Sequence, residues 1–354
     1  MSIPVYKDTK IYVVAPANAA TGGPELLHQL VYHLRNDLNL NAFMYYLPDN
    51  HPNPVHPEYK MYNNPYVREV EDNKNNIIIV PEIAGGIEIL PKFSNIRKAI
   101  WWLSVDNFLT SYMLAYKNDF LISKTLTKIY NRILKNGIKP NDKLKNKNFK
   151  QSNIYKTINS VDYHLVQSFY AFNFVKYLDI PDEKIYYLSD YLNKSFLKTE
   201  TDLSKKENFV VYNPTKGFEF TEKIILSAND IEFIPLINMS REKVIKTLQK
   251  AKVYIDFGNH PGKDRIPREA AISGCCVITG KKGSAKYFED VPIPDEYKFE
   301  DREENISKII DKIKDCFENF EERYEDFDYY RNIIKNEPEK FLKDLNKSFR
   351  GNLI

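Results

Sequence analysis

The stretch HPGKDRIPREAAISGCCVITG, residues 260–280, decides the fold expected for this chain. It follows a short apolar segment, residues 253–257, and it ends in a second apolar segment, residues 275–279. Between them, Pro267 and Gly274 match the residues that favour the start and the end of a short helix. The pattern therefore predicts a strand, a polar loop, a helix and a second strand, as in an open parallel sheet.

Charged side chains crowd the loop and the first turn of this predicted helix. They are Lys263, Asp264, Arg265, Arg268 and Glu269. Open parallel sheets bind ligands at the carboxyl ends of their strands, and a helix N-terminus attracts phosphate. The stretch thus predicts a site for a phosphate-containing ligand. The simpler alternative is an ordinary strand-loop-helix unit with solvated charges.

Length, charge and cysteine content exclude several classes of protein. The chain has 354 residues, which suits two domains, and its net charge of +3 does not indicate a nucleic-acid partner. No apolar run is long enough to cross a membrane, and the first ten residues lack the apolar core of a signal peptide. The three cysteines show no metal-ligand spacing. We therefore expect no metal and a cytoplasmic location.

The N-terminal half opens with the same strand-to-helix pattern. Residues 10–16 form a continuous apolar run, typical of a parallel strand covered on both faces. A helix with an apolar stripe follows, and Gly22 and Gly23 stand between the two. This turn either lines the ligand site or merely reverses the chain.

Two further strands of this half are followed by carboxylates. The run 77–82 ends at Glu82, and the run 99–105 is followed by Asp106. Because parallel strands end at one edge of their sheet, both carboxylates are predicted at that edge. Asp106 is the better candidate for a general base, although it could instead cap the helix that follows.

The segment from Lys124 to Lys150 is strongly basic, with nine Lys or Arg residues against Asp142 as its acidic residue. One interpretation is a solvated loop. The other is a surface that meets anionic lipid, where each basic residue contributes roughly 1 kcal/mol. The second interpretation would place the protein peripherally on the inner face of a membrane.

The C-terminal half contributes two more glycine-containing turns. An apolar strand, 208–212, leads into Asn-Pro and then into Lys216 and Gly217. After residue 279, a second turn carries Gly283 and Ser284. Residues 193–206, rich in Lys, Thr and Ser, precede this half and predict a domain boundary.

This half resembles the C-terminal domain of the GT-B glycosyltransferases. Members carry a strand, a glycine-containing loop, a helix with Pro shortly before Glu, then Ala, Gly and a second strand. Glu269, Ala270 and Gly274 match that order. Retaining members usually carry another Glu eight positions earlier, and Pro261 stands there. The resemblance therefore leaves retention and inversion both open.

The resemblance implies an α/β protein of the GT-B fold, with two Rossmann-like open parallel-sheet domains facing across a cleft. The first domain is expected over residues 1–195, on the acceptor side. A C-terminal helix, 324–354, is expected to cross back onto it. Residues 196–323 are expected to form the domain that binds the nucleotide-sugar.

The resemblance also implies roles for individual residues. In the family, the Glu that matches Glu269 grips the ribose, and a Lys-Gly pair with an Arg contacts the diphosphate. Asn213 stands near the place of that Arg. The residues expected at the donor, besides Glu269, are Lys216, Arg265, Arg268, Lys263, Asn213, Gly283 and Ser284. On the acceptor side, Gly22 and Gly23 would lie near the phosphates.

The implied activity is transfer of a sugar from a UDP- or GDP-sugar, without a cofactor, to a glycan or lipid-linked acceptor. Surface polysaccharides such as capsule or lipopolysaccharide are the expected products. Asp106, with Glu82 as second candidate, would be the catalytic carboxylate. Alternatives that share the architecture are a sugar-nucleotide epimerase, a polyol-phosphate transferase and a non-catalytic subunit that binds a sugar-nucleotide.

Overall fold

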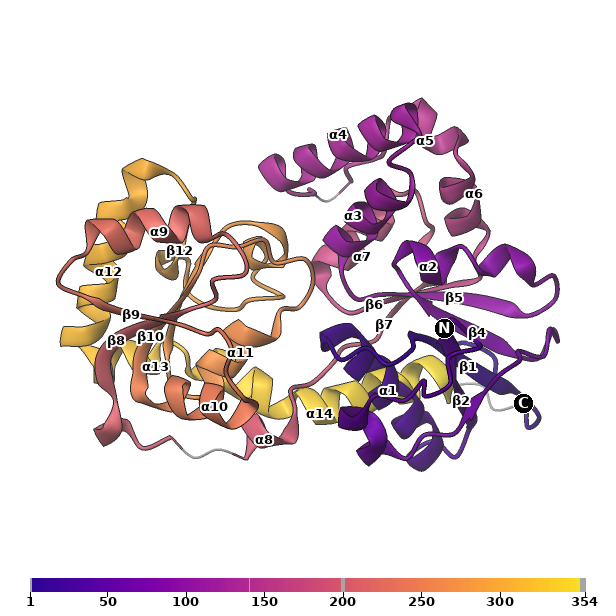
Figure 1. Cartoon of the computed structure of the whole chain (residues 1–354), viewed down its shortest axis with the longest axis horizontal. Coiled ribbons are helices and arrows are strands. Elements are labelled where there is room, and N and C mark those ends of the chain that lie inside the picture. The colour runs from indigo at the N-terminus through magenta and orange to yellow at the C-terminus, as the bar shows by residue number, and fades with distance from the viewer. Residues whose placement is uncertain (1, 140, 199–200, 351–354) are drawn as a thin grey trace. The chain divides into compact units, whose positions relative to one another are not determined.

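The computed structural model describes residues 2–139, 141–198 and 201–350. Residue 1, residues 199–200 of the predicted domain boundary, the last four residues of the predicted C-terminal helix and position 140 of the basic segment lie outside these ranges. The chain divides into two compact units (Figure 1). Unit 1 comprises Met1–Asp190 and Glu339–Ile354, and unit 2 comprises Tyr191–Pro338.

Unit 1 is built on a parallel sheet. Within the described residues its seven strands run in the order β3-β2-β1-β4-β5-β6-β7. They are β1 (Lys10–Pro16), β2 (Asn41–Leu47), β3 (Tyr66–Val67), β4 (Ile77–Pro81), β5 (Arg97–Trp102), β6 (Tyr163–Val166) and β7 (Ile185–Tyr187). Strand β4 is buried along its whole length. The continuous apolar runs of the central strands are what a sheet covered on both faces requires.

The helices of unit 1 connect these parallel strands. They are α1 (Gly22–Asn36), α2 (Ala84–Ile87), α3 (Val105–Ala115), α4 (Phe120–Asn136), α5 (Lys147–Gln151), α6 (Asn153–Ser160) and α7 (Phe169–Tyr177). Apolar residues recur at helical spacing over residues 108–135, and this stretch forms α3 and α4. Asp119 starts the second helix, because its side chain accepts hydrogen bonds from the amides of Leu121 and Ile122, both at 3.1 Å.

Unit 2 contains a second, smaller parallel sheet. Within the described residues its five strands run in the order β12-β11-β10-β8-β9. They are β8 (Glu207–Tyr212), β9 (Glu232–Pro235), β10 (Ala251–Asp256), β11 (Cys276–Gly280) and β12 (Lys298–Phe299). The predicted strands at 10–16, 253–257 and 275–279 correspond to β1, β10 and β11. Two-residue strands such as β12 are too short to show a periodicity in the sequence.

Helices lie on both faces of this sheet. They are α8 (Lys194–Leu197), α9 (Phe218–Ser227), α10 (Arg241–Lys250), α11 (Arg265–Ile272), α12 (Ile306–Glu318) and α13 (Phe320–Glu325). Helices α9 and α12 contact each other, as do α10 and α11, and the two pairs cover opposite faces (Figure 1). Ser240 caps α10 as its sequence predicts, since its hydroxyl accepts from the amide of Lys243 at 3.3 Å.

A buried lysine fastens the start of β8 inside unit 2. The ammonium of Lys206 donates to the carbonyl oxygens of Leu248, Ala251 and Ser273 at 3.0, 2.8 and 2.8 Å. These carbonyls lie at the C-terminal ends of α10 and α11, where helices leave carbonyl groups unsatisfied. Burial lowers the pKa of Lys206. The side chain therefore caps two helix ends.

The long helix α14 (Asp328–Phe349) runs from unit 2 into unit 1. The division falls at Pro338, which lacks the amide proton needed for an intrahelical hydrogen bond. Beyond that point, the Phe341 ring packs against His33 of α1 with ring centroids 5.3 Å apart. The Asp344 carboxylate accepts from the amide of Ser189 at 3.2 Å. These contacts join the end of α14 to unit 1.

Candidate functional site

The strand order of unit 2 makes the carboxyl ends of β8 and β10 its candidate ligand edge. The chain moves outward from β8 to β9, and then returns to β10 on the other side of β8. In doubly wound sheets, such a reversal leaves the carboxyl ends of the two neighbouring strands free to hold a ligand. The loops that follow these two strands are residues 213–217 and 257–264. Both were singled out from the sequence.

Two glycines let these loops touch. Gly217 has φ +61°, and a Cβ built on it would lie 2.4 Å from the carbonyl oxygen of Phe257. A Cβ on Gly258 would lie 2.4 Å from the Cβ of Lys216. Both distances are far below contact, so only glycine permits this approach. The close approach puts Lys216 beside the loop that follows β10.

Lys216 lies at this edge with its charge partly exposed. Its ammonium pairs with the Asp264 carboxylate at 2.9 Å, and 36% of its side chain remains accessible. Asn213, at the start of the same loop, uses its side-chain oxygen locally, accepting from the amide of Thr215 at 3.1 Å and from its hydroxyl at 2.6 Å. Asn213 thus shapes the turn, whereas Lys216 presents the positive charge.

Helix α11 begins at the same edge. Asp264 stands at its N-cap position, but its side chain makes no capping hydrogen bond. The carboxylate contacts Lys216 instead. The first-turn amides consequently receive no cap from Asp264, which is the condition for an anion to bind at a helix start. Arg265, partly exposed, opens the helix, and Glu269 lies one turn further with only 9% of its surface accessible.

Arg268 and Lys263 face a buried carboxylate on α14. Arg268 is wholly buried, and its guanidinium pairs with Glu337 at 2.8 Å. Its other nitrogens donate to the carbonyl oxygens of Lys263 and Asp264. The Lys263 ammonium also pairs with Glu337, at 2.7 Å. These contacts make Arg268 an anchor for the loop, so Lys216 and Arg265 are the better placed of the four cations for a ligand phosphate.

The turn after β11 packs against the loop that follows β10. Gly283 has φ +55°, and a Cβ on it would lie 2.0 Å from the carbonyl oxygen of His260. The amide of Ser284 donates to that same oxygen at 2.8 Å, and its hydroxyl donates to the carbonyl of Gly262. Both donors of Ser284 therefore hold the loop in place.

Glu82 lies immediately after β4 at the corresponding edge of unit 1. Its side chain is buried and accepts from the amide of Leu103 at 3.1 Å. Burial raises the pKa of Glu82 to about 7, against the opposing effect of its backbone hydrogen bonds. The carboxyl group thus titrates near neutral pH, which is the range that suits proton transfer.

Asp106 lies in the first turn of α3, also at this edge. Its carboxylate accepts from the hydroxyl of Tyr170 at 2.9 Å, and it is buried. The cap of α3 is Ser104, whose hydroxyl accepts from the amide of Asn107 at 3.1 Å. Asp106 is therefore not needed as the cap of this helix. Gly22 and Gly23 form the first turn of α1 after β1, so they too follow a strand of this sheet.

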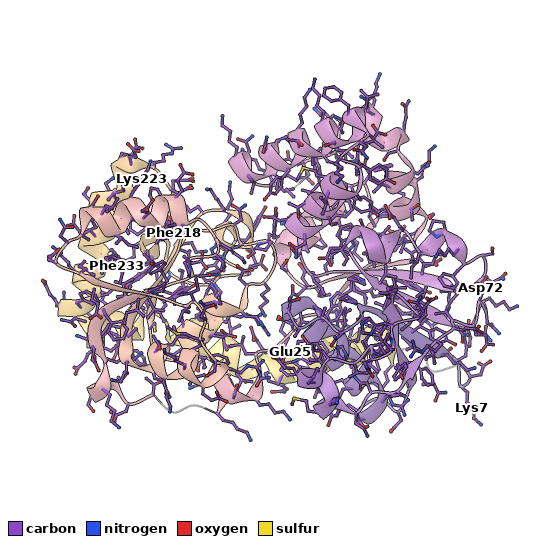
Figure 2. All side chains as sticks on the ribbon, viewed as in Figure 1. Lys7, Glu25, Asp72, Phe218, Lys223 and Phe233 are labelled. Atoms are coloured by element: carbon purple, nitrogen blue, oxygen red, sulfur yellow. The ribbon has the colours of Figure 1, made fainter. Side chains whose placement is uncertain are left out.

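Three residues around the loop that follows β10 were missed as site candidates. His260 is wholly buried between Asp256 and Asp264. Their spacing of four residues along the chain is the signal in the sequence, but Asp256 also falls within the predicted strand 253–257. Phe218 is the first residue of α9 (Figure 2). It is 40% exposed and stacks on Tyr212 with ring centroids 6.2 Å apart. Nothing in the sequence distinguished it from a core aromatic residue.

Comparisons with known proteins identify the fold. No family model and no curated sequence matches the chain. The structure is similar to HepE of Anabaena, solved with UDP-glucose, at 11% identity and TM-score 0.57, covering 95% of this chain and 98% of that one. It is similar to sucrose-phosphate synthase of Thermosynechococcus elongatus at 10% identity and TM-score 0.60, covering 96% and 97%. The chain spans 56% of the length of TarM, at 17% identity, TM-score 0.48 and 78% coverage of this chain. The predicted fold is confirmed, since two parallel α/β sheets of this kind are the fold of the GT-B glycosyltransferases.

Proposed function

We propose that the protein is a glycosyltransferase that uses a nucleotide-diphosphate-sugar as donor. The observation that carries this proposal is the ligand edge of unit 2. There, the partly exposed Lys216, the start of α11 and Glu269 follow two strands on either side of the chain reversal. A cation beside a helix start that the N-cap side chain does not cap suits a diphosphate, and a carboxylate one turn away suits ribose hydroxyls.

A UDP-sugar is the first donor to test. HepE, whose fold is similar, was solved in complex with UDP-glucose. On this proposal Lys216 and Arg265 contact the diphosphate, while Gly283 and Ser284 hold the loop that follows β10. Phe218 offers an exposed aromatic face at the start of α9. As the nucleoside diphosphate leaves, the two cations would offset the charge that develops on its oxygens.

Unit 1 supplies the candidates for proton transfer. In the reaction, the bond between sugar C1 and the phosphate oxygen breaks, and a bond from C1 to an acceptor hydroxyl oxygen forms. The hydroxyl proton must pass to a base, and the electron pair of the broken bond leaves with the diphosphate. Asp106, oriented by Tyr170, is our first candidate for the base, and Glu82 is the second.

We further propose that the acceptor is a glycan or a lipid-linked sugar of a surface polysaccharide, and that α4 lies near an anionic membrane. Leu114, Phe120 and Leu121, beside the turn between α3 and α4, are 70%, 72% and 64% exposed. Lysines of the basic segment that are exposed on α4 and after it would meet anionic head groups. They are Lys124, Lys128, Lys135, Lys139, Lys143, Lys145 and Lys147. Among the described residues, no helix has both the length and the apolar character needed to cross a bilayer.

The donor is tested by thermal stability with nucleotides. Purified protein is melted with UDP, GDP, CMP, CDP and ADP, beside the Glu269→Ala variant. A ligand of the folded state at 100 times its dissociation constant adds about 2.7 kcal/mol to the free energy of unfolding. We expect stabilisation by one diphosphate and a smaller effect in the variant. No response to any nucleotide would contradict the donor site.

Turnover then separates the enzyme from its alternatives. The protein is incubated with the sugar-nucleotide of the base that binds, and the products are followed by mass spectrometry. Release of nucleoside diphosphate together with a glycosylated acceptor supports the proposal. An isomerised sugar-nucleotide would indicate an epimerase instead. Binding without turnover on any acceptor would indicate a non-catalytic subunit.

Membrane contact is tested separately, by sedimentation with vesicles of neutral lipid alone or with anionic phosphatidylglycerol added. We expect binding to the anionic vesicles only, and weaker binding when Lys124 and Lys128 are both changed to Gln. As a matched control, Lys308 and Lys335, lysines outside the segment, are changed to Gln. Equal loss in the two double variants, or equal binding to both vesicles, would contradict the proposal.

A further inference from the structure

The loop that follows β10 holds a row of ionisable side chains that are mostly buried. Asp256, His260 and Asp264 follow one another along the chain, and Lys216 from the loop that follows β8 extends the row. The Nε2 atom of His260 lies 3.7 Å from the Asp256 carboxylate, and its Nδ1 atom lies 3.4 Å from that of Asp264. Asp264 in turn pairs with Lys216 at 2.9 Å.

The imidazole of His260 is inaccessible to solvent, and contacts of the His260 backbone fix its position. Its carbonyl oxygen accepts from the amide of Ser284, and Gly283 packs against that oxygen. Within the described part of the chain, neither ring nitrogen makes a hydrogen bond of ordinary geometry. Buried polar groups usually have a partner. The interactions that remain for the ring are those with the carboxylates of Asp256 and Asp264.

The arrangement is that of a bridging cation rather than of a metal site. The two carboxylates approach opposite nitrogens of the ring, whereas a metal ion would bind only one of them. A neutral imidazole carries one N–H and can present it to only one carboxylate, whereas an imidazolium carries two and places its positive charge near both. The other partners of Asp256 are neutral, namely the hydroxyl of Tyr254 and the amide of Gly258, both at 2.9 Å.

The same charges determine how firmly Lys216 is held. If Lys216 turned from Asp264 toward a ligand phosphate, Asp264 would lose its closest positive partner. Asp264 is largely buried, and an unpaired buried carboxylate is costly. Burial raises the pKa of Asp264, and His260 and Lys216 oppose that rise. A positive charge that stays on His260 would keep Asp264 paired while Lys216 moves.

We propose that His260 is a positioning residue that, as an imidazolium between Asp256 and Asp264, frees Lys216 to bind the diphosphate of the donor. The proposal rests on the donor site proposed above. It identifies a residue that acts through Lys216 and does not itself touch the ligand. Asp256 orients the imidazolium, and Asp264 is the carboxylate that His260 and Lys216 share.

The test measures binding of a nucleoside diphosphate and of its nucleoside by calorimetry. The diphosphate used is whichever of UDP, GDP and ADP binds the wild type most tightly, and the nucleoside is the one with the same base. In the His260→Asn variant we expect the dissociation constant of the diphosphate to rise about tenfold, because one charge-assisted contact is lost. The dissociation constant of the nucleoside should stay unchanged. Equal weakening of both ligands would indicate a structural role and overturn the proposal.

Two further variants show whether His260 acts through Lys216. In a Lys216→Met background, His260→Asn should produce no additional loss of diphosphate affinity. In the His260→Asn background, Asp264→Asn should restore affinity, because the carboxylate that retains Lys216 is gone. The proposal would be overturned if the affinity losses of Lys216→Met and His260→Asn were additive. It would also be overturned if Asp264→Asn restored no affinity to His260→Asn.

A spectroscopic measurement tests the charge of the ring directly. The chain has six histidines, so nitrogen-15 labelling of histidine gives few signals, and the His260→Asn variant assigns the one in question. Because a carboxylate lies near each ring nitrogen, we expect both nitrogens of His260 to carry a proton in the folded protein at about pH 7. A neutral ring there would overturn the proposal. If the wild type binds no nucleoside diphosphate while this ring is protonated, the proposed donor site fails and not the charge of His260.

Discussion

Replacing Glu82 by Gln should change how the stability of unit 1 depends on pH. Burial raises the pKa of Glu82 from 4.5 to about 7. Between these values the folded chain holds a proton that the unfolded chain has released, so the free energy of unfolding falls as the pH rises. The difference between the two pKa values corresponds to about 3 kcal/mol, and the loss is complete above the folded value.

Glutamine keeps an oxygen for the amide of Leu103 and does not ionise in this range. We therefore expect the stability of Glu82→Gln, relative to the wild type, to increase by up to about 3 kcal/mol between about pH 5 and about pH 8. At about pH 5, the difference in stability between Glu82→Gln and the wild type mainly reflects how the two side chains pack. Comparing the two pH values thus isolates the charge from the shape of the side chain.

Tryptophan fluorescence during urea unfolding measures this quantity for unit 1. The chain has two tryptophans, Trp101 and Trp102, both buried in β5, and Pro81 of the neighbouring strand pairs with Trp101. Glu88→Gln is the matched control, because Glu88 is exposed in the same unit. A constant difference between wild type and Glu82→Gln over this pH range would refute the reasoning.

The remaining predictions concern unit 2. Lys216→Met should weaken diphosphate binding about tenfold and spare the nucleoside. Lys223, on α9 (Figure 2), pairs with Glu303 at the surface, and Lys223→Met should leave the calorimetric affinity unchanged. Gly283→Ala should destabilise unit 2 by about 2 kcal/mol, because φ is positive and no space exists for a methyl group. Lys206→Met should cost about 3 kcal/mol, since three buried carbonyls lose their donor. Thiol labelling measures the loss of stability in both variants, because all three cysteines are buried in unit 2. Labelling rates equal to those of the wild type would contradict these two predictions.

The order of strands and helices could be predicted because it depends on local signals. The predicted strand over residues 10–16 is β1, since a continuous apolar run bounded by polar residues has few alternatives. Pro267 and Gly274 bounded α11 closely for the same reason. The short edge strand β3 was not predicted, because two residues are too few to show the alternating pattern of a strand.

The candidate site was predictable only where its residues follow strands. Lys216 and Glu269 could be selected because the sequence shows the strand, the glycine and the helix around each of them. The partner of Arg268 could not be predicted from the sequence, because Glu337 lies 69 residues further along the chain, on α14. The environment of His260 depends on the packing of three loops, which spacing alone does not reveal.

The most direct test of the account is hydrogen–deuterium exchange of the whole chain with and without the nucleoside diphosphate that binds. The central claim places that ligand at the edge formed by the loops after β8 and β10. It predicts slower exchange at residues 213–217, at 257–264 and in the first turn of α11, with no comparable change elsewhere in unit 2. Protection confined to other segments, with exchange in these loops unchanged, would contradict it.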